Sequence, residues 1–93
     1  MLMKTEHRVK TEKNVYSKKS KDGIILLKEN RAFILQLNCT GEFLWKLCRQ
    51  PISISSLIKK LTRTYGVSKE IAHHDVSEFI KQCLHEGIMK RID

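Results

Sequence analysis

The stretch Phe33-Ile34-Leu35-Gln36-Leu37-Asn38-Cys39-Thr40-Gly41 marks a change from strand to helix. Its first five residues form an alternating, β-prone run. Asn38 and Thr40 are residue types that favour helix N-termini, because their side-chain oxygens accept hydrogen bonds from first-turn amides. The apolar residues Phe43, Leu44 and Trp45 follow at once. The sequence therefore predicts a strand that passes into a helix with almost no loop.

Two further strands are predicted upstream. Residues 15–19 can form the first, and the turn signal at residues 20–23 ends in a glycine, which tolerates positive φ. Residues 24–28 form the second, whose four consecutive apolar side chains indicate that both faces are covered. Residues 29–32 turn the chain again into a third strand over residues 33–37. The expected arrangement is a three-stranded antiparallel meander.

Downstream of Thr40 the apolar period changes from two to about 3.6, which predicts helices. A first short helix ends before Pro51, Ser53 caps a second helix that ends at Gly66, and Ser68 caps a third that ends at Gly87. Residues 88–92 can add a short extended segment. The apolar positions expected to pack inward, with Trp45 beside the first group, are Phe43, Leu44, Leu47 and Cys48, then Ile54, Leu57, Ile58, Leu61 and Tyr65, then Ala72, Val76, Phe79, Ile80, Cys83 and Leu84.

The fold class predicted from these elements is α+β, a three-stranded antiparallel sheet followed by three helices. Residues 1–13 are polar and poorly periodic and are expected to form a flexible N-terminal tail, with a single domain over residues 14–93. The chain of 93 residues carries a net charge of +8, of which residues 1–21 contribute seven basic and two acidic side chains. The pattern suits an acidic partner. No secretory signal or membrane-spanning run is seen, and three cysteines are consistent with reduced thiols, so we expect a cytoplasmic protein without a membrane partner.

The order and spacing of several short motifs resemble the PqqD family over about residues 14–89. The motifs are Asp22-Gly23-Ile24-Ile25-Leu26-Leu27, Leu37-Asn38-x-Thr40-Gly41, Leu44-Trp45-x-Leu47, Ser53-Ile54-x-x-Leu57, Tyr65-Gly66-Val67, Asp75-Val76-x-x-Phe79-Ile80 and Glu86-Gly87-Ile88. The resemblance implies a winged helix-turn-helix-like fold and a non-catalytic role. Such proteins bind the leader segment of a ribosomally made precursor peptide and deliver it to a modifying enzyme. That enzyme is a radical SAM maturase, as in pyrroloquinoline quinone biosynthesis, or a lasso-peptide leader peptidase.

The resemblance also implies where the peptide binds. The leader joins the sheet as an extra strand beside the third strand and packs against the third helix, which is the physics of β-augmentation at an exposed strand edge. The residues expected to form the two walls are Phe33, Ile34, Leu35 and Gln36, and Val76, Phe79, Ile80 and Cys83. Each of the helix residues could instead serve only the core. Basic residues near the sheet, expected to steer an acidic leader, are Lys18, Lys19 and Arg31.

Other functions find less support in the residues. A helix-turn-helix outline and positive charge suit DNA, but the third helix, over residues 69–86, carries a net charge of −2, which is unfavourable for phosphate contacts. An adaptor for another protein is a further alternative. Metal-ligand spacings such as CxxC or HExxH are absent from the sequence, and no local pattern places a histidine near Cys39, so we expect no catalytic residues, no metal and no cofactor. An exposed edge strand permits a monomer or a dimer formed by edge pairing or swapping.

Overall fold

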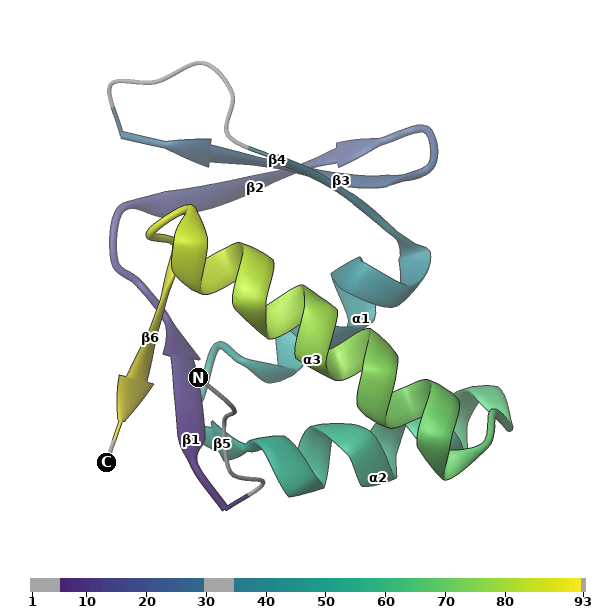
Figure 1. Ribbon diagram of the computed structural model, residues 1–93. Coiled ribbons are helices and arrows are strands. Elements are labelled where there is room, and N and C mark those ends of the chain that lie inside the picture. The colour runs from purple at the N-terminus through teal and green to yellow at the C-terminus, as the bar shows by residue number, and fades with distance from the viewer. Residues whose placement is uncertain (1–5, 30–34, 93) are drawn as a thin grey trace.

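The computed structural model describes residues 6–29 and 35–92. They form the elements β1 (Arg8–Thr11), β2 (Val15–Ser20), β3 (Gly23–Lys28), β4 (Leu35–Asn38), α1 (Cys39–Leu47), β5 (Ile52–Ser53), α2 (Ile54–Tyr65), α3 (Lys69–His85) and β6 (Met89–Ile92). The strands build two three-stranded antiparallel sheets, and the three helices lie beside them (Figure 1). The α+β class and the three helices are confirmed, whereas the likeness to a winged helix-turn-helix stays a prediction.

The first sheet is the predicted meander, in the order β2-β3-β4. Both α1 and α3 lie on the same side of this sheet (Figure 1). Ile24 and Leu26 of β3 face that side and are buried, whereas Ile25 and Leu27 on the other face are only half-buried. The prediction that both faces of this strand are fully covered is therefore wrong, because no helix of the described residues packs on the second face.

The second sheet, in the order β5-β1-β6, corrects the expectation of a flexible tail for residues 8–11, whereas residues 1–5 of that predicted tail lie outside the described residues. Arg8–Thr11 form a strand, and Val9 at its centre is completely buried opposite Ile52 and Arg91. One apolar side chain among polar neighbours gives no periodic signal, and both partner strands lie far along the chain. The extended segment predicted over residues 88–92 is confirmed, since β6 supplies one of those partners.

Each helix begins at the predicted cap. The side-chain oxygens of Asn38, Ser53 and Ser68 accept hydrogen bonds from amides in the first turns at 2.9, 3.1 and 3.2 Å. At the end of α2, Gly66 adopts φ 67°, a left-handed conformation that glycine enters without steric cost. These local signals therefore fix where the helices start and where α2 ends.

The core lies between the helices and the inner faces of the sheets. The predicted inward side chains are buried for the most part, and Trp45 is only 5% exposed. Phe43, Leu47 and Leu84 are partly buried, and Tyr65, in the last turn of α2, is 46% exposed. The Tyr65 ring packs edge-on against Phe43 at a centroid distance of 5.4 Å. Among the described residues, no helix is long and apolar enough to span a membrane.

Candidate functional site

The outer edge of β4 presents main-chain groups that the sheet does not use. The amide of Glu29 donates to the carbonyl of Asn14 at 3.0 Å, which marks a hydrogen-bonded pair at the end of the β2–β3 ladder. Because bonded and non-bonded pairs alternate along antiparallel strands, Ile25 bonds to β2. Gln36 lies opposite Ile25, so the N–H and C=O of Gln36 point away from β3. No strand within residues 6–29 and 35–92 pairs with that side of β4.

A groove of about 340 Å³ lies beside this free edge. It is bounded by β4, the first turns of α1 and the middle of α3. The residues that line it are Gln36, Leu37, Asn38, Thr40, Gly41, Leu44, His74, Asp75, Glu78, Phe79 and Gln82. An edge strand and an open groove thus lie along the same line, which is the geometry that accepts an extended peptide.

The predicted strand wall lies partly at this groove. Gln36 is exposed and lines it, while Leu35 is half-buried on the inner face of the sheet, opposite Leu26. Phe33 and Ile34 lie outside the described residues.

Of the four α3 residues that the sequence predicts for the helix wall, three do not line the groove. Val76, Ile80 and Cys83 belong to the core, and none of them lines this groove, so their contact with a peptide stays a prediction. Phe79, at 7% exposed, is the one member of the predicted set that lines the groove.

Besides Phe79, four α3 residues line the groove that the sequence analysis did not predict as peptide contacts. These four are His74, Asp75, Glu78 and Gln82. Their spacing of three and four residues places them along one flank of the buried stripe, and this helical spacing is the signal that could have identified them.

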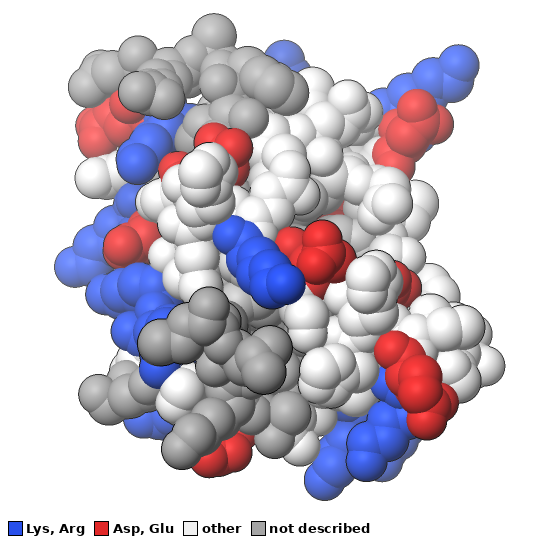
Figure 2. Space-filling view, in the orientation of Figure 1, with Lys and Arg blue, Asp and Glu red and all other residues white. Residues whose placement is uncertain are grey.

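The groove is acidic, although the protein as a whole is basic. Asp75 and Glu78 line it, and none of its lining residues is a lysine or arginine. Lys81 reaches Glu78 from outside the groove at 3.5 Å, in a pair whose side chains are about 60% exposed, so solvent screens it strongly. Figure 2 shows acidic side chains over the middle of this face, where α3 runs, with a basic side chain beside them, and further basic side chains gathered at the left.

The predicted steering residues are not at the groove. Lys18 and Lys19 lie on β2, at the opposite edge of the sheet from β4. Lys19 is engaged with the carboxylate of Glu42 at 2.9 Å, and Lys46 contacts the same carboxylate at 3.0 Å. The hydrogen bond from Lys19, then that from Lys46, lowers the pKa of Glu42 below its ordinary value. Arg31 lies outside the described residues.

Two of the three thiols are buried, and the described histidines belong to no metal-binding group. Burial raises the pKa of Cys48 and of Cys83 to about 12, so neither is a nucleophile at neutral pH. Within the described part of the chain, no three His, Cys, Asp or Glu side chains are grouped closely enough to hold a metal ion.

Both a protein family and a solved structure are similar to this chain. The family model for coenzyme PQQ synthesis protein D (PqqD) matches residues 23–89. No curated protein matches the chain in sequence. Among solved structures, TbiB1 in complex with the TbiA(beta) leader peptide is similar, with a TM-score of 0.74 and 17% sequence identity. The similarity covers 87% of this chain and 94% of that chain, so the two proteins share a fold.

Proposed function

This chain belongs to the PqqD family, and we propose that it binds the leader segment of a ribosomally made precursor peptide. The observation that carries this proposal is the free edge of β4 beside the groove under α3. The similar structure of TbiB1 contains a leader peptide, which supports the same role for this fold.

In the proposed mechanism, the leader adds to the first sheet as a strand along β4. The N–H and C=O of Gln36 bond to the leader backbone, which contributes affinity without sequence preference. Alternate leader side chains then point into the groove, where the slightly exposed Leu37 and Phe79 provide apolar surface. Specificity comes from how these side chains fit. Phe33 and Ile34 remain predicted contacts on the continuation of the same strand.

The charge of the groove indicates which leader fits it. With Asp75 and Glu78 on the α3 wall, a basic or hydrogen-bond-donating leader side chain is favoured at that position, and an acidic one is disfavoured. This differs from the sequence-based proposal of an acidic leader steered by Lys18, Lys19 and Arg31. We propose that any such steering acts at longer range and not in the groove itself.

The partner enzyme is proposed from the family alone. A protein without a catalytic centre serves best by holding the leader, so that the core of the precursor reaches a modifying enzyme at high local concentration. A radical SAM maturase or a leader peptidase is the proposed enzyme, in the cytoplasm, with no cofactor on this chain.

An NMR titration tests the binding role. Isotope-labelled protein is titrated with the leader of the precursor peptide encoded beside its gene, and separately with random duplex DNA at the same concentration. We expect shifts confined to residues 35–38 and 74–82 with the peptide and none with DNA. A silent peptide titration together with salt-sensitive DNA shifts at residues 59–63 would overturn the proposal in favour of DNA binding.

A further inference from the structure

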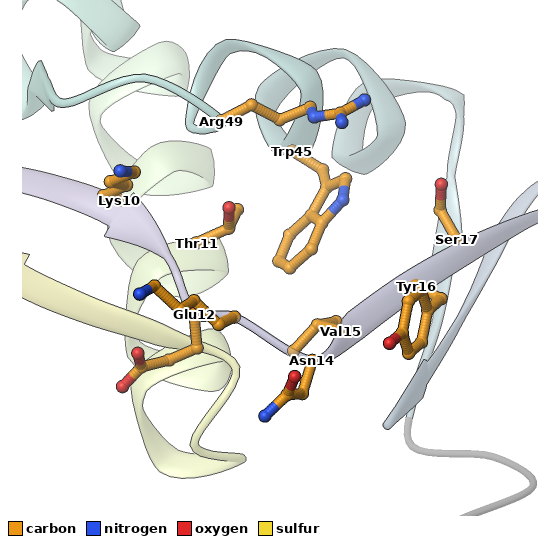
Figure 3. A pocket seen from close by; sticks show the side chains of 10 residues that line it. Lys10, Thr11, Glu12, Asn14, Val15, Tyr16, Ser17, Trp45 and Arg49 are labelled. Atoms are coloured by element: carbon orange, nitrogen blue, oxygen red, sulfur yellow. The ribbon is translucent and has the colours of Figure 1, made fainter. Parts of the chain in front are cut away.

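A second cavity lies where the chain passes from one sheet to the other, between β1 and β2. Its volume is about 370 Å³, and Figure 3 shows it from close by. The residues that line it are Lys10, Thr11, Glu12, Lys13, Asn14, Val15, Tyr16, Ser17, Trp45 and Arg49. Eight of these ten precede residue 23, where the match to the PqqD family begins, and only Trp45 and Arg49 come from the matched segment.

The indole of Trp45 forms one wall of this cavity. Its nitrogen lies on the side of the ring that faces Ser17, and the guanidinium of Arg49 extends above that side (Figure 3). No described residue accepts a hydrogen bond from this indole or forms an ion pair with Arg49. Two unused donors and a hydroxyl therefore line one cavity, and that combination suits a carboxylate.

The charge around the cavity favours the same ligand. Lys10, Lys13 and Arg49 line it against a single acidic residue, Glu12, whose carboxylate points away from the indole (Figure 3). An acidic group is thus attracted here, whereas the groove beside β4 repels it.

A free strand edge runs along the cavity. In the β2–β3 ladder, Asn14 belongs to a bonded pair, so the alternation turns the N–H and C=O of Val15, Ser17 and Lys19 away from β3. Because β2 is the outer strand of its sheet, no strand of the described residues occupies that side. An extended peptide paired there would lie beside the cavity that Val15 and Ser17 line.

We propose that the β2 edge and the Trp45–Arg49 cavity bind an extended acidic segment of a second protein. One carboxylate of that segment accepts hydrogen bonds from the Trp45 indole and the Arg49 guanidinium, and its backbone pairs with β2. The two edges of one sheet then take two different chains, which their opposite charges keep apart. That the second protein is the modifying enzyme rests on the proposed function above, whereas the site itself does not.

The test uses a fluorescein-labelled peptide of alternating valine and glutamate, and a matched peptide with lysine in place of glutamate, in anisotropy titrations. We expect the glutamate peptide to bind and to shift the Trp45 indole N–H signal, and the lysine peptide to bind at least tenfold more weakly at this site. Ser17→Pro removes an N–H that β3 does not use and should weaken binding at least tenfold, whereas Ser17→Ala should change it less than twofold.

Arg49→Ser provides a second test that does not alter a strand, because Arg49 is an exposed residue of the turn after α1. It should also weaken the glutamate peptide at least tenfold. The proposal is overturned if the glutamate peptide does not bind, or if the wild type, Ser17→Pro and Arg49→Ser bind it equally. Either result is expected if the lysines near the β2 edge serve only to prevent edge-to-edge aggregation. Gln36→Pro, on the β4 edge, should leave this binding unchanged, so the outcome is independent of leader binding.

Discussion

Replacement of Gln36 by proline removes one main-chain donor from the free edge of β4 without touching the ladder to β3. The N–H of Gln36 points away from β3, so the sheet loses no hydrogen bond, and edge strands tolerate proline at such positions. Gln36→Ala is the matched control, because it removes the same exposed side chain but keeps the N–H. The pair of variants therefore isolates strand addition from side-chain contact.

The magnitude follows from one lost main-chain hydrogen bond. Its net contribution is about 1 kcal/mol, and the leader carbonyl that loses its donor adds about 1–3 kcal/mol. Together, about 2–4 kcal/mol corresponds to roughly 30- to 700-fold weaker binding, because about 1.4 kcal/mol is a factor of ten. For Gln36→Ala, an exposed substitution changes the free energy by about 0.5 kcal/mol, or roughly twofold.

Isothermal titration calorimetry with the leader of the precursor encoded beside the gene measures both variants against the wild type. Circular dichroism melts of both variants establish that they are folded. Strand addition is refuted if folded Gln36→Pro binds the leader as tightly as Gln36→Ala does. In that case the groove would hold the peptide through side chains alone.

Other predictions concern folding and reactivity. Gly23→Ala should destabilise the protein by about 2–4 kcal/mol in urea unfolding, because Gly23 has a φ of +156° and a Cβ there would lie 1.9 Å from the Leu37 carbonyl oxygen. Gly66→Ala should destabilise it by only about 1 kcal/mol, because the space around Gly66 is open. Equal losses of stability in the two variants would contradict this reasoning. Since hydrogen bonds lower the pKa of Glu42, its contribution to stability is fully present above pH 4.5 and is lost as the pH falls through the lowered value, so the wild type should lose more of its melting temperature than Glu42→Gln between pH 7 and pH 3. A thiol reagent should modify one cysteine, Cys39, in the native protein and the two buried ones only after unfolding, and fast reaction of all three would refute the buried placement.

The caps and the meander could be predicted because they are local. Asn38, Ser53 and Ser68 each satisfy a first-turn amide within three residues, so sequence position alone locates the helix starts. The apolar period of α3 likewise identified its buried stripe. The same pattern could not say which neighbours of the stripe face solvent and which face a groove, because both are polar.

The sequence by itself determined the meander, the three helices that follow it with their starting residues, the family and the existence of an exposed strand edge. Only the tertiary structure decided three other matters. It placed Val9 between strands from the end of the chain and the α1–α2 link, a pairing that depends on long-range closure. It brought Asp75 and Glu78 to the β4 edge, and it placed Lys10, Lys13 and Arg49 around the cavity that Trp45 lines beside β2. The charge of a site depends on which distant side chains the fold brings together, and no local pattern encodes that.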